Sequence, residues 1–248
     1  FSWVAVKRLG LSPWGERRRG LLVMRGLFGF GALSCFFWAV THLPLADATV
    51  IQYVNPILVA LLAAVFLGES VGPVEIGGVG VSLVGVILIA QPSFLFGGQA
   101  ARLDPFAVGV ALLGAFLSAC AYTTIRAVHG QEDPMVVVFY FPLIATPLAL
   151  PVAWPVLEWP GPVGWLLLLG VGVFTQIAQI FMTRGLHLER AGRATSISYL
   201  QIVFAFAWGV LLFGERPSAL SVLGAVLVVG SSIVVARSRH RGEEPPEA

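Results

Sequence analysis

Amides, hydroxyls and phenols recur inside otherwise apolar segments of this chain, and such side chains bind small polar molecules through hydrogen bonds. In the segment 47–67 they share one face at helical spacing: Thr49, Gln52, Tyr53 and Pro56, with Asn55 beside them. Because Pro56 has no N–H, the carbonyl of Gln52 is left as a free acceptor. This face suits a polar ligand. We favour a cavity for Tyr53 and Asn55, with hydrogen bonding between helices as the alternative.

Other apolar segments carry similar groups, and polar stripes of this kind must face protein or water rather than lipid. For the stripe within 163–184, substrate contact and packing against neighbouring helices are equal alternatives. An aromatic side chain at position 38 either stacks on a ring-bearing ligand or packs against other helices, and packing is the favoured interpretation. The candidates are Ser198, Tyr199 and Gln201 in 195–213, Thr175 and Gln179 in 163–184, Tyr122 in 106–126, and Trp38 in 21–42.

Charged residues near the ends of apolar segments have two interpretations each. Arg25 lies a few residues inside its segment, so it is expected to snorkel to the cytoplasmic interface. The alternative is an anion contact at the inner mouth of a cavity. Glu69 and Glu215 are interpreted mainly as structural residues at helix ends, with a gating contact to a basic partner as the alternative. No carboxylate falls in the middle of an apolar segment, so coupling to protons or sodium through a buried acid is not expected.

The elements that position these residues are predicted to be membrane-spanning helices. The chain of 248 residues is 57% hydrophobic and only 11% charged, with a mean hydropathy of +0.88. Soluble domains carry about 25% charged residues, and a helix needs about 20 apolar residues to cross a bilayer. We therefore predict an all-α polytopic membrane protein with spans at 21–42, 47–67, 74–95, 106–126, 135–157, 163–184, 195–213 and 218–237.

Enzyme chemistry is not indicated. Cys35 and Cys120 lie in different apolar segments, and the four histidines are scattered, so neither a metal site nor a cofactor is predicted. Glycine-rich phosphate loops and the common hydrolase motifs are missing from the sequence. The expected partners are the lipid bilayer and a small-molecule substrate, with no nucleic acid, and a homodimer is left open.

The chain repeats itself at a spacing of 146 residues. The repeat begins with an Ala-Thr pair and ends with a Gly-Glu pair that closes an apolar segment. Paired positions are Ala48-Thr49 and Ala194-Thr195, Tyr53 and Tyr199, Asn55 and Gln201, Gly68-Glu69 and Gly214-Glu215, and Gly78 and Gly224. Duplicated helical bundles of transporters give this pattern. We divide the chain into a first repeat at 1–98, a second at 99–237 and a cytoplasmic tail at 238–248.

The second repeat begins near Asp104, so the same spacing places the start of the first repeat about 41 residues before Phe1. The parent protein is therefore expected to have ten helices in two inverted five-helix repeats, with the first repeat truncated here to three full helices. Basic residues gather on alternate loops, which places residues 1–19 and the C-terminal tail in the cytoplasm. The break at 42–47 lacks Lys and Arg, whereas its counterpart at 187–193 is basic, so the copies are expected to be inverted.

The residues of the repeat resemble those of the EamA family of the drug/metabolite transporter superfamily. The resemblance covers about residues 15–237 and rests on Arg25-Gly-Leu27, Leu43–Thr49, Tyr53-Val-Asn-Pro56 and Leu67-Gly-Glu69, followed by the second-copy motifs. It implies ten helices around a central cavity and transport of amino acids, nucleotide-like cofactors or other small metabolites, mostly across the bacterial inner membrane. The sequence departs from the family at Ile202, where a proline is usual, so only the first copy is expected to contain a proline-kinked helix.

The leading hypothesis is therefore a transporter of small neutral or zwitterionic metabolites that works by alternating access. A non-transporting truncated remnant or membrane assembly partner is the alternative, and an intramembrane enzyme is a more remote one. The expected location is the bacterial inner membrane.

Overall fold

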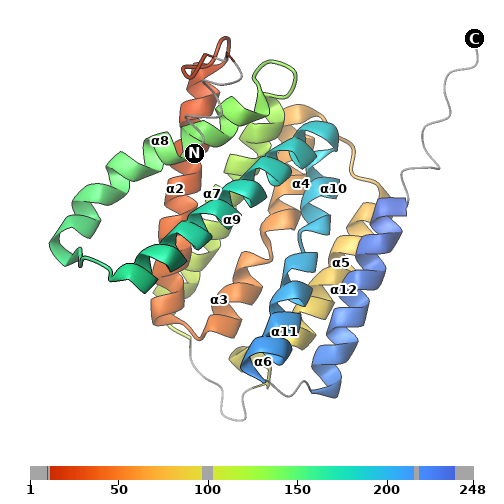
Figure 1. The fold of residues 1–248 in the computed structure, drawn as a ribbon. Coiled ribbons are helices and arrows are strands. Elements are labelled where there is room, and N and C mark those ends of the chain that lie inside the picture. The colour runs from red at the N-terminus through yellow and green to blue at the C-terminus, as the bar shows by residue number, and fades with distance from the viewer. Residues whose placement is uncertain (1–9, 11, 97–102, 215–217, 238–248) are drawn as a thin grey trace, which may run out of the picture. The chain divides into compact units, whose positions relative to one another are not determined.

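The computed structural model of this chain describes residue 10 and residues 12–96, 103–214 and 218–237. Every regular element in these ranges is a helix (Figure 1). In chain order they are α2 (Arg19–His42), α3 (Leu45–Gln52), α4 (Asn55–Leu67), α5 (Pro73–Ala90), α6 (Ser93–Phe96), α7 (Pro105–Ala127), α8 (Pro134–Ala153), the 3₁₀ helix η1 (Trp154–Val156), α9 (Pro162–Leu188), α10 (Ala191–Ile197), α11 (Leu200–Phe213) and α12 (Ala219–Arg237).

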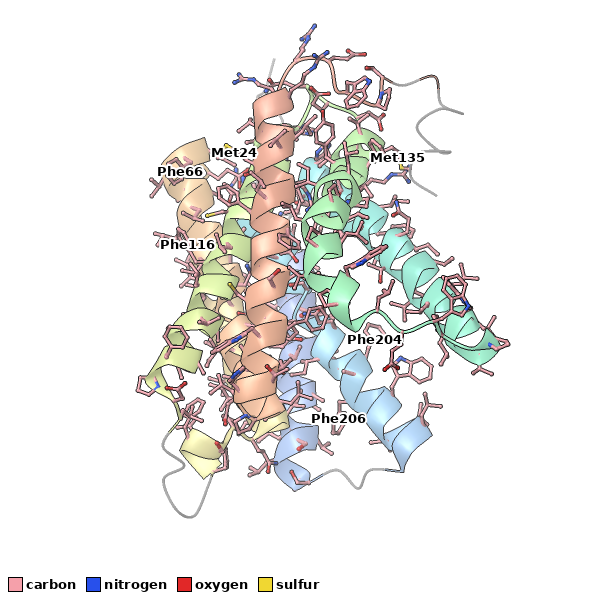
Figure 2. The ribbon with its side chains drawn as sticks, turned by 90° about the vertical axis from the view of Figure 1, so that its left-hand side faces the viewer. Met24, Phe66, Phe116, Met135, Phe204 and Phe206 are labelled. Atoms are coloured by element: carbon pink, nitrogen blue, oxygen red, sulfur yellow. The ribbon has the colours of Figure 1, made fainter. Side chains whose placement is uncertain are left out.

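In the described part of the chain, eight helical segments are long and apolar enough to cross a membrane; α3 and α4 together form one of them, and α10 and α11 another. Large apolar side chains stand out from these helices, as Phe66, Phe116 and Phe204 show in Figure 2. Phe66 is 73% exposed and Phe204 65% exposed, which suits a surface covered by lipid tails. The prediction of an all-helical polytopic membrane protein is confirmed.

Two helices end on a glycine at equivalent positions of the repeat. Gly68 follows α4 and Gly214 follows α11, and both have a φ of 66°. A residue with a side chain seldom adopts this left-handed conformation, so glycine stops the helix with little strain. The predicted Gly-Glu helix ends are therefore found at both glycines, while Glu215 lies outside the described residues.

Both helices are broken, although only the first copy has a proline at its break. The first breaks between α3 and α4 at Tyr53-Val54, and the second breaks between α10 and α11 at Ser198-Tyr199. In the second break, the backbone N–H of Ile202 donates to the carbonyl of Tyr199, three residues back, at 3.1 Å. This shorter 3₁₀ pattern replaces the α-helical one. A proline is therefore not needed for the break.

Side-chain hydroxyls compete with the backbone just before the second break. Thr195 donates to the carbonyl of Ala191 at 2.8 Å, and Ser196 donates to the carbonyl of Gly192 at 2.7 Å. Hydroxyls that bond to carbonyls in the preceding turn bend helices. This explains how the second copy acquires its break without the family proline.

The chain folds as two compact units, one formed by residues 1–31 with 120–190 and the other by residues 32–119 with 191–248. In the first unit, α2 packs closely on α8, because a Cβ added at Gly26 would lie 2.6 Å from Cδ1 of Ile144. Helices α8 and α9 form a hairpin through η1 (Figure 1). Met135 and Phe139 of α8 form a small core there, with Ile180 packed against it.

A buried carboxylate holds the start of α2 in the first unit. Glu132, in the loop before α8, is 7% exposed. It accepts hydrogen bonds from the backbone N–H groups of Arg17 and Arg18, each at 2.8 Å, and from that of Glu16 at 3.0 Å. Burial acts to raise the pKa of Glu132, but the N–H groups of Arg18, Arg17 and Glu16 outweigh it and hold the pKa below its usual range.

In the second unit, the equivalent helices α5 and α12 pack side by side (Figure 1). They are antiparallel, because Gly78 near the start of α5 meets Val235 near the end of α12, while Gly224 near the start of α12 meets Ile89 near the end of α5. A Cβ at Gly224 would lie 2.5 Å from the backbone oxygen of Gly85. Small residues let the two helices approach closely here.

A contact between α5 and α12 is matched by a second contact at the equivalent positions of the two copies. Ser82 and Ser231 share a hydrogen bond of 2.7 Å. The residues at the equivalent positions of the other copy, 146 positions away, are Val228 for Ser82 and Gly85 for Ser231. These two residues are also in contact, because a Cβ at Gly85 would lie 2.7 Å from Cγ2 of Val228. An interface with this property is self-complementary, as at a two-fold axis.

Candidate functional site

The two helix breaks meet at a pair of tyrosines in the second unit. The rings of Tyr53 and Tyr199 are stacked, with centroids 5.5 Å apart and planes inclined by 23°. The hydroxyl of Tyr199 donates to the backbone carbonyl of Tyr53 at 2.8 Å, between residues 146 positions apart. Equivalent residues of the two copies are therefore in direct contact, although the two tyrosines do not play the same role.

Some of the candidates are occupied by bonds within the protein. The side-chain amide of Asn55 is buried and donates to the carbonyl of Ala115 on α7 at 3.1 Å. Thr49 donates to the carbonyl of Leu45 at 2.6 Å. Ser198 donates to the carbonyl of Thr195, within its own helix turn. These bonds favour a packing role for all three residues, including Asn55, for which a cavity had been the favoured interpretation.

Gln201 is the candidate of this group with the most open environment. Its side chain is exposed and its amide reaches the hydroxyl of Tyr53. Gln52 is half-buried, and Pro56 is buried in the first turn of α4. Trp38 stacks on His42 with ring centroids 3.8 Å apart, which matches the packing interpretation.

A second group of candidates lies in the first unit around Arg25. Snorkelling of this side chain is ruled out, because Arg25 is only 3% exposed. Its Nη2 donates to Oε1 of Gln179 on α9 at 2.9 Å, and its guanidinium carbon lies 4.8 Å from the ring centre of Phe141 on α8. Tyr122 of α7 is close enough to interact electrostatically with the guanidinium. The neighbouring helices thus hold the charge inside the protein.

The polar stripe on α9 does not lie in one environment. Thr175 is exposed, Gln179 is half-buried and Thr183 is buried with a hydroxyl that has no partner. Gln176 lines a groove of about 810 Å³ between α8 and α9, together with apolar residues such as Phe139 and Trp165. The Nε2 of Gln176 is also buried without a hydrogen-bond partner.

Acidic residues organise one end of the second unit. Glu69 accepts a hydrogen bond from the backbone N–H of Ala191, the first residue of α10, at 2.8 Å. Glu75 in the first turn of α5 is paired with Arg193 at 3.3 Å. This bond joins Glu69 to the start of α10 and favours the structural interpretation of Glu69 over a gating contact. The pair of Glu75 and Arg193 was not foreseen from the sequence.

A family model matches residues 1–91 and 105–237, and its description is EamA-like transporter family. The chain belongs to this family. The two matched segments correspond closely to the two copies of the repeat, and the family resemblance inferred from the sequence motifs is confirmed.

Several curated relatives of this EamA-family chain are named as transporters, exporters or solute carriers. It is 34% identical to the pseudopaline exporter CntI of Pseudomonas aeruginosa over 220 residues, which cover 88% of this chain and 75% of the exporter. It is 28% identical to human solute carrier family 35 member G1, covering 90% of this chain and 63% of that protein. It is 27% identical to a riboflavin transporter of Rhizobium johnstonii, covering 99% and 80%. These names support a membrane transporter and are consistent with a non-enzymatic role.

A solved crystal structure has the same fold. It matches the EamA-family chain with a TM-score of 0.78 at 20% identity, covering 95% of this chain and 83% of the other. At this identity the likeness concerns the fold alone.

Proposed function

We propose that this chain transports a small neutral or zwitterionic metabolite across the bacterial inner membrane by alternating access. The paired helix breaks at Tyr53 and Tyr199 are proposed to form part of the substrate path. The contact between these equivalent tyrosines is the observation that carries the proposal. Transporters with inverted repeats place their substrates at discontinuous helices, where backbone groups are released from the helical pattern.

The packing of α5 against α12 supports the inverted arrangement of the copies. The two helices occupy equivalent places in the repeat, yet they run antiparallel and interact through paired positions. Two parallel copies related by an axis along the membrane normal would not produce this antiparallel pairing. Alternating access then requires two arrangements of the repeats, each opening the path to one side of the membrane.

The polar groups next to the tyrosines support an uncharged or zwitterionic part of the substrate at this position. Tyr53 and Gln201 offer a hydroxyl and an amide, and neither has a charged neighbour among the interactions described above. Relatives are named for pseudopaline and for riboflavin, so these two compounds belong in the first substrate panel, together with amino acids.

Transport should be tested with the purified protein in lipid vesicles, by following exchange of labelled compounds from this panel. For a transported compound, Gln201→Ala should weaken apparent affinity by about five- to a hundred-fold, because a hydrogen bond to the substrate is lost. The matched control is Leu61→Ala, since Leu61 is 59% exposed on the outer face of α4. Folded protein that exchanges none of the compounds above the level of empty vesicles would favour the non-transporting alternative.

A further inference from the structure

Hydrogen-bond donors outnumber acceptors around Arg25. The guanidinium uses Nη2 on Gln179, which leaves its Nε buried and without a partner. The same bond occupies the oxygen of Gln179, so the amide N–H groups of that side chain are free to donate elsewhere. Tyr122 of α7 interacts electrostatically with the guanidinium. One turn earlier on α9, the Nε2 of Gln176 is a further buried donor without a partner.

No carboxylate balances this charge in the described part of the chain. The neighbours of Arg25 are an amide, an aromatic face and a phenol, all of them uncharged. Buried charges are normally paired, and a buried donor left unsatisfied carries a desolvation cost. The arrangement is therefore suited to an anion that arrives from outside the protein.

The backbone also makes room for the guanidinium. A Cβ added at Gly29, one turn after Arg25 on α2, would lie 2.7 Å from Nη1 of Arg25 and 3.0 Å from the ring of Phe141. A side chain at this position would push the guanidinium out of its place. Gly26 and Gly29 therefore serve different purposes: the first brings α8 close, and the second leaves space for the charge.

We propose that Arg25 binds the carboxylate of the transported metabolite, with Gln179 and Tyr122 as additional donors. A carboxylate accepts two parallel hydrogen bonds from one guanidinium, which satisfies Nε together with a terminal nitrogen. The inference rests on the proposed function and narrows its substrate class to zwitterions that carry a carboxylate, such as amino-acid-like metabolites.

Binding should be measured on the purified full chain with two probes of matched shape. The carboxylate probe is 3-phenylpropanoate and the neutral probe is 3-phenylpropanamide. The phenyl tail is chosen because Gln176 lines an apolar groove. The carboxylate should raise the Tm and give a saturable titration, and the amide should do neither, since a ligand that binds only the folded state stabilises it.

Three variants make the test specific. Arg25→Gln should weaken binding of the carboxylate by about ten- to a hundred-fold, because charge-assisted hydrogen bonds are lost. Gln179→Glu is nearly isosteric and places a permanent carboxylate beside Nη2 of Arg25, so it should remain folded and bind the probe no more tightly than Arg25→Gln. The control is Arg184→Gln, which removes an exposed arginine of α9 and should bind as the wild type does.

The inference is overturned if the wild type binds both probes equally, binds neither, or binds inorganic phosphate in place of the carboxylate. It is also overturned if Gln179→Glu, folded by its Tm, binds 3-phenylpropanoate like the wild type. Transport assays in lipid vesicles distinguish failure of this inference from failure of the proposed function. Transport of a carboxylate compound that is unaffected by Arg25→Gln contradicts the inference and leaves the proposed transport function intact. If carboxylate binding depends on Arg25 but no compound is transported in vesicles, the inference stands and the proposed transport function is contradicted.

Discussion

At the scale of single residues, equivalent positions in the two copies have diverged in role. The hydroxyl of Tyr199 satisfies a backbone carbonyl at the first helix break, whereas that of Tyr53 meets the exposed amide of Gln201. Asn55 bonds to the carbonyl of Ala115 instead of facing open space. Removing the hydroxyl of Tyr199 or the amide of Asn55 should therefore lower the stability of the protein. Removing the hydroxyl of Tyr53 or the amide of Gln201 should lower transport.

Tyr199→Phe should lower the stability of the protein in detergent by about 0.6 kcal/mol, a typical value for one hydrogen bond between membrane helices. The reason is that the carbonyl of Tyr53 loses its donor while the ring stacking is kept. Tyr53→Phe is the matched control and should keep that bond, so its Tm should stay near the wild-type value while transport falls. Equal losses of Tm in both variants would contradict this division of roles.

At the scale of helices, the loop before α8 and the start of α2 depend on one carboxylate. Glu132 accepts backbone hydrogen bonds in its ionised form, and its pKa lies below the usual range. A depressed pKa contributes stability above the pKa of the unfolded chain, about 4.3 for Glu, and this contribution is lost as the pH falls through the folded value.

The wild type should therefore lose stability when the pH is lowered below about 4.3, and Glu132→Gln should lose less over the same range because the titrating group is gone. Thermal unfolding in detergent at a series of pH values measures the difference. Glu158→Gln removes an exposed glutamate and should keep the wild-type pH dependence. If both variants follow the wild-type curve, Glu132 does not govern the acid response.

The breaks between α3 and α4 and between α10 and α11 also belong to the scale of helices. The second break forms without a proline, and the first is held by the bond from Tyr199 to the carbonyl of Tyr53. Pro56→Ala should consequently leave the first break in place. The measurement is the distance between spin labels at the exposed positions Leu45 and Leu61, on the two sides of the break. A longer distance in the variant would mean that the proline causes the break.

At the scale of the whole molecule, the two copies are joined where α5 and α12 pack with their backbones in contact. A Cβ at Gly224 would lie 2.5 Å from the backbone oxygen of Gly85, and backbone cannot move aside as a flexible side chain can. Gly224→Ala should therefore lower the Tm strongly, with a destabilisation of about 1–3 kcal/mol from overpacking. The control is Gly80→Ala in α5, where an added Cβ meets nothing within 4 Å.

The orientation of the copies in the membrane is testable by labelling. In a background without Cys35 and Cys120, a cysteine at Pro44 should react with a membrane-impermeant reagent added outside cells, and one at His129 should react only after the membrane is opened. The basis is the excess of arginine and lysine on the loops assigned to the cytoplasm. The reverse pattern would contradict both the orientation and the inverted repeats.

The sequence alone determined the fold class, the helix ends and the family. Long apolar blocks leave little choice but membrane helices, and glycines at positions 68 and 214 stop them. The repeat was visible because both copies keep the same residues at the same spacing. Such features are local or periodic, so each can be recognised without knowing which helices are neighbours.

Tertiary structure alone decided the environment of each polar side chain. Arg25 was expected at the interface and is buried, and Asn55 was expected in a cavity and bonds to a neighbouring helix. The second helix break and the pair of Glu75 and Arg193 were not foreseen. The physical reason is that a hydrogen bond or ion pair depends on atoms from distant parts of the chain. Residue types and spacing specify which groups are able to pair, but only packing selects the pairs.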